Sequence, residues 1–151
     1  MFSFNTILCP TDFSEQSTAA FHLANSLAKE YQARLVLVSV KPPTEVVHGG
    51  FGMSPPEPED ENEALKSQLM ALQPDDKTLT VEHFYRQGEP GAEIVRLANE
   101  VKADLIVMGT HGRGGLSRML MGSVAEHVMR HASCPVVTVK QPVASATLTT
   151  E

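Results

Sequence analysis

Cysteine is scarce in this chain, whose 151 residues include only Cys9 and Cys134. Neither lies close to another cysteine at the short spacing of zinc-binding or redox-active pairs. The sequence therefore gives no indication of a cysteine-based metal centre or of a disulfide framework.

Long apolar runs are also lacking. No stretch approaches the roughly 18 apolar residues that a membrane-spanning helix requires. The opening residues, MFSFNTILCPTDF, have no basic segment, and Asn5, Thr6, Pro10 and Asp12 interrupt their apolar character. They do not resemble a secretory signal. We expect no membrane partner and a cytoplasmic location.

Positive charge is in deficit, because the chain has 12 lysine and arginine residues but 18 aspartate and glutamate residues, which gives a net charge of −6. A protein that binds duplex nucleic acid normally carries a basic face, so nucleic acid is not an expected partner. Much of the acidity is local, at Glu57, Glu59, Asp60, Glu61 and Glu63. The remaining chain is nearly neutral and compatible with a small anionic ligand.

The composition is that of a globular domain, with 42% hydrophobic and 20% charged residues. Short apolar runs at about residues 4–9, 35–40, 78–84, 105–108 and 135–140 predict five strands. Helical periodicity predicts helices at about residues 14–31, 59–72 and 122–132, and a further helix after Gly91. Ser14, or Asp12 with Glu15, can cap the first helix. We expect a single domain over residues 1–140, with a mobile proline- and glycine-rich loop at 42–58 and a frayed tail at 141–151.

This alternation predicts the α/β class, with a doubly wound parallel sheet and helices on both faces. Ligands bind such sheets at the carboxyl ends of the strands, where the winding reverses. If the first and fourth strands are central neighbours, Pro10, Thr11 and Asp12 meet the glycines that begin at Gly109. Cys9 and Cys134 then lie at opposite ends of the sheet, and no disulfide between them is expected.

Five of the ten glycines lie between Gly109 and Gly122, in a segment that joins a strand to a helix. A helix N-terminus binds phosphate readily, and glycine lets backbone amides approach an oxygen closely. The hydroxyl of Ser123 can donate to the same anion. Neither a GxxxxGK[ST] loop nor a GxGxxG motif directly after a strand is present. A glycine-rich loop that serves turn geometry alone is the alternative.

The spacing Gly109-x2-Gly112-x9-Gly122-Ser123 resembles the signature of the ATP-binding branch of the universal stress protein family. The similarity extends to ILCPTDFSEQS, PGAEIVRLANEVKADLIVMGTHGRGG and CPVVTV, and covers about residues 3–140 outside the proline-rich loop. It implies a five-stranded parallel sheet of order 3-2-1-4-5, an adenine nucleotide alpha hydrolase-like fold. It also implies a homodimer in which the last strands of two subunits meet, through Val136, Val137, Thr138 and Val139.

The resemblance further implies a site for ATP, and we expect Mg²⁺ or Mn²⁺ to accompany the nucleotide because few basic side chains are available to neutralise the triphosphate. Asp12 would hold the ribose or adenine side, with Pro10 and Thr11 shaping the turn beside it. Val40 and Met108 would line the adenine pocket. The residues implied around the ribose and phosphates are Gly109, Gly112, Arg113, Gly122, Ser123 and Val124. No catalytic side chain and no metal-ligating side chain is assigned.

Several of these residues have plainer interpretations. Asp12 can cap the first helix, Val40 and Met108 belong to the core in either case, and Arg113 can be a solvated charge. His111 can touch a phosphate, but we expect it to face solvent. His127 and His131 have the i, i+4 spacing of two zinc ligands, but no third ligand is evident.

Three functions remain open: a nucleotide-dependent stress-response or regulatory protein that acts on unknown protein clients, a dimeric interaction module that binds no nucleotide, and a slow ATP hydrolase. Phosphoryl transfer requires a positioned base together with concentrated positive charge or metal-holding carboxylates. The glycine-rich segment offers His111, Arg113 and Arg118 but neither lysine nor carboxylate. Efficient hydrolysis is therefore not expected.

Overall fold

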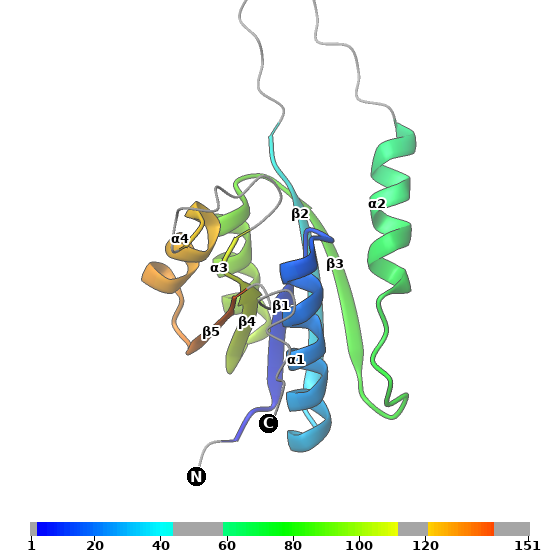
Figure 1. Ribbon diagram of the computed structural model, residues 1–151, viewed down its shortest axis with the longest axis vertical. Coiled ribbons are helices and arrows are strands. Elements are labelled where there is room, and N and C mark those ends of the chain that lie inside the picture. Colours follow the sequence, from blue (N-terminus) through cyan, green and yellow to red (C-terminus); the bar gives the residue numbers. More distant parts are fainter. Residues whose placement is uncertain (1–2, 44–58, 112–120, 141–151) are drawn as a thin grey trace, which may run out of the picture.

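The structure is a computed structural model that describes residues 3–43, 59–111 and 121–140. Strands and helices alternate along this part of the chain (Figure 1). The elements are β1 (Thr6–Pro10), α1 (Glu15–Tyr31), β2 (Arg34–Lys41), α2 (Glu59–Ala71), β3 (Val81–Gln87), α3 (Pro90–Val101), β4 (Leu105–Gly109), α4 (Ser123–His131) and β5 (Val136–Val139).

The strands form one five-stranded sheet in the order β3-β2-β1-β4-β5. Every neighbouring pair is parallel, with Ile7 of β1 opposite Leu35 of β2 on one side and Leu105 of β4 on the other. The predicted order 3-2-1-4-5 is confirmed. The winding reverses between β1 and β4, so their carboxyl ends mark the edge at which such folds bind ligands.

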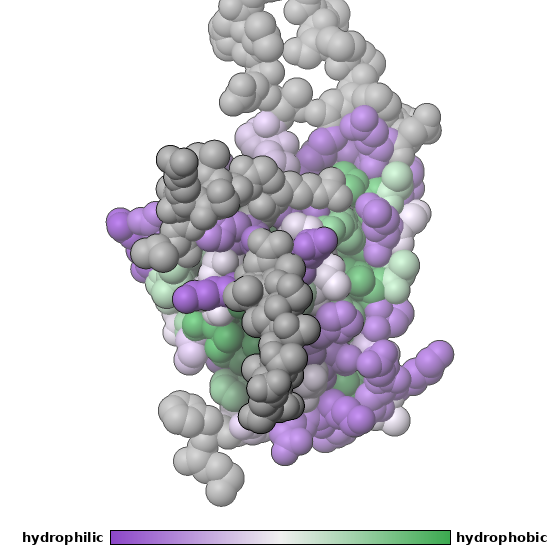
Figure 2. All heavy atoms as spheres, in the orientation of Figure 1, coloured by the Kyte–Doolittle hydropathy of each residue, from purple (hydrophilic) through white to green (hydrophobic). Residues whose placement is uncertain are grey.

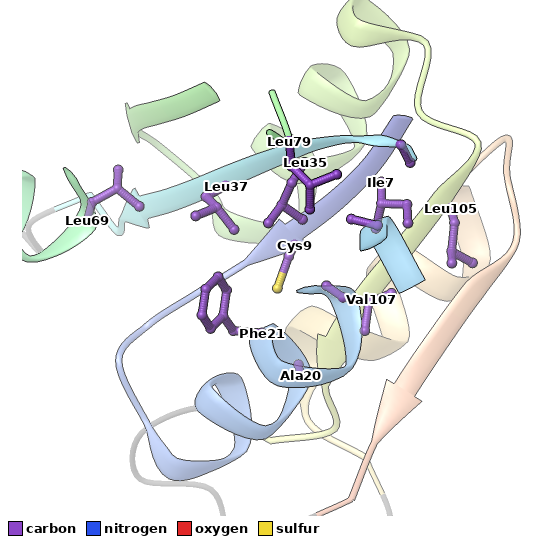
Figure 3. Packing of buried hydrophobic residues seen from close by; sticks show 13 residues of the cluster. Ile7, Cys9, Ala20, Phe21, Leu35, Leu37, Leu69, Leu79, Leu105 and Val107 are labelled. Carbon is purple, nitrogen blue, oxygen red and sulfur yellow. The ribbon is translucent and has the colours of Figure 1, made fainter. Parts of the chain in front are cut away.

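Two apolar layers hold the helices to the sheet, and the predicted helix coverage of both faces is confirmed. One layer lies between the sheet and α1 with α2, and it includes Cys9, Phe21 and Leu69 (Figure 3). The other lies between the sheet and α3 with α4, and it includes Leu97 and Val128. The central strands are apolar on both faces, which is why β1 is buried along its whole length.

The third strand begins three residues later than predicted. The side chain of Asp76 accepts hydrogen bonds from the backbone N–H and the hydroxyl of Thr78, and its carbonyl accepts one from Leu79 N–H. This turn keeps residues 78–80 out of the strand. Pairing with β2 then continues from Val81 as far as Gln87, because β2 itself extends to Lys41.

Local capping sets the ends of the helices. Ser14, one of the two predicted caps, is the N-cap of α1, and its hydroxyl accepts the N–H of Ser17. Pro90 begins α3, where a missing N–H costs nothing. Helices α1 and α3 each end in a left-handed residue, Gln32 and Lys102 respectively.

Most of the predicted mobile loop and the whole predicted tail lie outside the described residues. Within residues 3–43, 59–111 and 121–140, none of the helices has the length and apolar character to cross a membrane. Cys9 and Cys134 are both free thiols, in agreement with the expectation of no disulfide.

Candidate functional site

The candidate site lies at the carboxyl ends of β1 and β4, two neighbouring strands at the centre of the sheet (Figure 1). After Pro10 the chain turns into α1 on one face of the sheet. After Gly109 it leads toward α4 on the other face. The two connections therefore diverge from a common edge, as the sequence predicted for Pro10–Asp12 and Gly109.

The segment that follows β1 is held by short-range hydrogen bonds. Thr11 N–H donates to the carbonyl of Val38 at 2.8 Å, and its buried hydroxyl donates to Ser17 Oγ at 3.2 Å. Asp12 Oδ1 accepts the N–H of Ser14 at 3.0 Å. Phe13 adopts a left-handed φ of 63°, a conformation that is strained for an aromatic residue. These contacts give the turn a defined shape beside the end of β1.

The opposite wall is formed by the end of β4 and the start of α4. Thr110 donates its N–H to Val139 of β5 at 3.1 Å and accepts the N–H of Gly122 at 2.6 Å. Gly122 is the N-cap of α4 and has no side chain with which to cap it. The N–H groups of a helix's first turn have no partner within the helix. Those of Ser123, Val124 and Ala125 therefore present the positive end of the helix dipole.

Gln16, on the first turn of α1, connects the two walls. Its side-chain oxygen accepts the backbone N–H of His111 at 2.8 Å, across 95 positions of sequence. Gln16 was not among the predicted site residues. The helical pattern places it near the start of α1, but no feature of the sequence indicates that this amide reaches the end of β4.

The expectation that His111 faces solvent is wrong for one of its ring nitrogens. Nδ1 lies 3.1 Å from the hydroxyl of Thr110, while Nε2 is buried and has no hydrogen-bond partner among the residues that the structure describes. When Nδ1 accepts from the Thr110 hydroxyl, Nε2 carries the hydrogen and can donate to an anion. A buried polar atom without a partner costs free energy, and a ligand oxygen would remove that cost.

Close packing accounts for two glycines of this region. A Cβ on Gly109 would lie 3.0 Å from the Cβ of Gln16 and 3.2 Å from its carbonyl carbon. A Cβ on Gly122 would lie 3.1 Å from the carbonyl oxygen of Thr110. A side chain at either position would therefore be crowded by protein atoms before any ligand is considered. The φ of Gly122, −73°, is open to every residue, so backbone freedom is not its reason.

The remaining predicted residues lie in or against the core, at the end of β1, or outside the described residues. Met108 is buried in the layer under α3 and α4, and Val40 and Val124 pack against the same layer. Pro10 is buried and ends β1. Predicted residues Gly112 and Arg113, together with Arg118, lie outside the described residues.

The described residues contain no group of three or more histidine, cysteine, aspartate or glutamate side chains that could hold a metal ion. His127 and His131 stack their rings with centroids 4.2 Å apart, and Nδ1 of His131 lies 2.9 Å from the carbonyl of His127. Cys9, beside Pro10, is fully buried, and burial raises the pKa of its thiol to about 12. It is protonated at neutral pH and is not a nucleophile.

The fold is that of a doubly wound α/β protein. The N-terminus of α4, which can accommodate an anion, lies where the winding of the sheet reverses between β1 and β4. Comparison with known proteins makes the assignment specific, because the model of the universal stress protein family matches residues 3–140. The chain belongs to the universal stress protein family.

Similarity to individual proteins supports the same family assignment. The chain is similar to universal stress protein MJ0531 of Methanocaldococcus jannaschii, with 39% identity over 92% of this chain and 84% of the relative. Among solved structures, MJ0577 of the same organism gives a TM-score of 0.72 at 27% identity, covering 93% of this chain and 99% of that one. A universal stress protein solved in complex with cAMP gives a TM-score of 0.69 at 25% identity, covering 93% of this chain and 100% of that one.

Proposed function

We propose that this universal stress protein binds ATP at the carboxyl edge of β1 and β4 and acts in the cytoplasm as a nucleotide-dependent regulatory protein on protein clients. The observation that carries the proposal is the N-terminus of α4. It begins after a glycine that supplies no capping side chain, and it adjoins the end of β4 at the point where the sheet reverses. A phosphate group suits such a terminus through both its charge and its acceptor oxygens.

Other atoms of the same edge fit a phosphate. The hydroxyl of Ser123 is on an exposed residue at the first position of α4. Nε2 of His111, which has no partner within residues 3–43, 59–111 and 121–140, is close by, because the adjacent ring carbon Cδ2 lies 4.0 Å from the position of a Cβ on Gly122. Amide, hydroxyl and imidazole donors would surround the phosphates, with Gly112 and Arg113 contributing from the glycine-rich segment.

The nucleoside would lie toward β1 and β2. In this arrangement Asp12 holds the ribose or adenine side, and Val40 and Met108 contribute apolar surface near the ends of their strands. That the related universal stress protein was solved with cAMP supports an adenine nucleotide as the ligand class. We infer that Mg²⁺ or Mn²⁺ arrives with ATP, bridging its phosphate oxygens, because such ions commonly bind through substrate phosphates rather than through a dedicated protein cage.

Isothermal titration calorimetry tests the proposal. We expect ATP to bind in the micromolar range, about −8 kcal/mol, more tightly with Mg²⁺ than with EDTA. Mass spectrometry of the freshly purified, denatured protein would identify any nucleotide that co-purifies. The absence of binding heat at millimolar ATP would contradict the proposal and favour a dimeric interaction module without nucleotide.

Two substitutions at one position separate the contributions of the helix terminus. Ser123→Ala removes the hydroxyl, whereas Ser123→Pro removes both the hydroxyl and the backbone N–H. Proline is tolerated at the first helical position, and the extended backbone of Gly122 (φ −73°, ψ 162°) suits a residue that precedes proline. We expect Ser123→Pro to weaken ATP binding by about tenfold or more, equivalent to about 1.4 kcal/mol, and Ser123→Ala to weaken it less.

The matched control is Ser67→Ala, at an exposed position on α2, which should leave ATP affinity unchanged. Circular dichroism and thermal unfolding establish that each variant is folded. If Ser123→Pro and the wild-type protein bind ATP with equal affinity, the phosphates do not bind at the N-terminus of α4.

We also propose that the protein is a homodimer through β5. This strand is at an edge of the sheet, and Val137 is 37% exposed there. Apolar side chains reach the surface over β5 in Figure 2. Such edges are usually paired or covered in native proteins.

A further inference from the structure

The two walls of the candidate site are joined by one side chain. Gln16 is half-buried on the first turn of α1, and it accepts the N–H of His111, the second residue after β4. The backbones approach so closely that the Cβ of Gln16 occupies the space in front of Gly109. The amide group of Gln16 is thus directed to one backbone donor at the entry to the glycine-rich segment.

The bond completes a set of three that fixes Thr110 and His111 from different elements. Thr110 N–H donates to β5, Thr110 carbonyl accepts from the N-cap of α4, and His111 N–H donates to α1. The Thr110 hydroxyl further holds the His111 ring through Nδ1, and the buried Nε2 is left without a partner in the described part of the chain. Of the three backbone bonds, only the one from α1 is made by a side chain and can be removed by substitution.

We propose that Gln16 is a positioning residue of the nucleotide site: by holding His111 N–H, it fixes the end of β4 so that the donors of His111 and of the α4 N-terminus converge on the phosphates. The inference rests on the proposed function. Gln16 itself contacts protein rather than nucleotide in this scheme. Its contribution is to reduce the ordering that the phosphate-binding residues would otherwise undergo on binding.

The test uses the full-length chain and two substitutions, Gln16→Leu and Gln16→Ala. Both remove the acceptor and keep the Cβ that packs against Gly109, and the alanine variant repeats the test should the branched side chain disturb the packing of α1. Gln16→Glu keeps an acceptor oxygen at the same reach. Gln68→Leu, at an exposed position on α2, is the matched control.

The first measurement is hydrogen exchange of the His111 amide without nucleotide. We expect exchange about fivefold or more faster in Gln16→Leu and Gln16→Ala, the factor that corresponds to one hydrogen bond of ordinary net strength. Exchange in Gln16→Glu and Gln68→Leu should match the wild-type protein. Unchanged exchange in both Gln16→Leu and Gln16→Ala would overturn the proposal, because the bond would then not hold His111.

The second measurement compares the affinities of ATP and adenosine by calorimetry. We expect Gln16→Leu and Gln16→Ala to weaken ATP by about fivefold or more and to leave adenosine unchanged. A general loss of structure would weaken both ligands and would count against a positioning role. Faster His111 exchange with unchanged ATP affinity would also overturn it. Failure of the wild-type protein to bind ATP would instead overturn the proposed function, and the role of Gln16 in binding would fall with it.

Discussion

Cys9 is a titratable group placed in an apolar environment. It lies in the layer between the sheet and α1, near Ala20 and Phe21 (Figure 3), and burial raises the pKa of its thiol from 9.0 to about 12. Well below pH 9 the thiol is protonated in both the folded and unfolded states and makes no pH-dependent contribution. Above pH 9 the unfolded chain loses this proton while the folded protein keeps it, so stability falls as pH rises.

We therefore predict that the free energy of unfolding decreases more steeply between pH 9 and 10.5 in the wild-type protein than in Cys9→Ala. The difference in slope should approach about 1.4 kcal/mol per pH unit, the value for one proton. Urea unfolding at several pH values measures it. Other titrating groups are present in both proteins, so their contributions cancel in the difference. Identical slopes would mean that the Cys9 thiol ionises equally well in the folded state.

The glycines show how far the sequence can explain the residue type at a single position. Their clustering predicted a backbone that other atoms approach closely, and the structure describes two glycines of the cluster, Gly109 and Gly122. The approaching atoms at Gly109 and Gly122 are protein atoms, from Gln16 and Thr110. A ligand and a neighbouring helix impose the same demand on a glycine, so the sequence could not separate these causes. For the same reason, the glycine at position 122 is a poorer probe of phosphate binding than Ser123.

At the scale of elements, helix α1 begins with a cap that can be tested directly. Ser14 Oγ accepts the N–H of Ser17 at 3.2 Å, satisfying one of the first-turn donors of a 17-residue helix. We predict that Ser14→Ala lowers the free energy of unfolding by about 1 kcal/mol, measured by urea denaturation. The control is Ser26→Ala in the same helix, where the hydroxyl donates to the carbonyl of His22 within the helix and caps no terminus. Equal losses in the two variants would contradict the capping role.

The strands differ in how well their sequences determined their ends. β2 and β4 are buried on both faces, so their apolar runs mark their extents closely. β3 is an edge strand with one open side, and its half-buried residues carry a weaker pattern. Its start depends on the turn at Asp76 and its end on the length of β2. Both are tertiary features that local alternation does not contain.

At the scale of the whole molecule, the alternation of elements predicted a parallel sheet with helices on both faces, and the family resemblance implied the order of its strands. The predicted convergence of Pro10–Asp12 and Gly109 on one edge followed from that order. The contact between Gln16 and His111 did not, because it depends on how far α1 lies from the end of β4. Such a distance is set by the packed side chains of the layer between them rather than by any local motif.

The register of β5 indicates how its proposed role in dimerisation can be tested. The carbonyl of Pro135 accepts the N–H of Ile106 in β4, and the carbonyl of Val139 accepts the N–H of Thr110, the residue after β4. Backbone groups of alternate residues in a strand point to opposite sides. The N–H groups of Val136 and Thr138 therefore face the open edge, where a second copy of the chain would pair.

We predict that the wild-type protein in solution has twice the 16.4 kDa mass of one chain, measured by light scattering, and that Thr138→Pro is a monomer. Proline at this position removes an outward N–H and leaves the bonds to β4, a substitution that edge strands tolerate. The control is Val81→Pro at the first residue of β3, on the opposite edge. Its N–H also points outward, because the neighbouring Thr80 carbonyl faces β2 by accepting from Leu35, and this variant should remain dimeric. A monomeric wild-type protein, or a Thr138→Pro variant that is folded and still dimeric, would exclude pairing through β5.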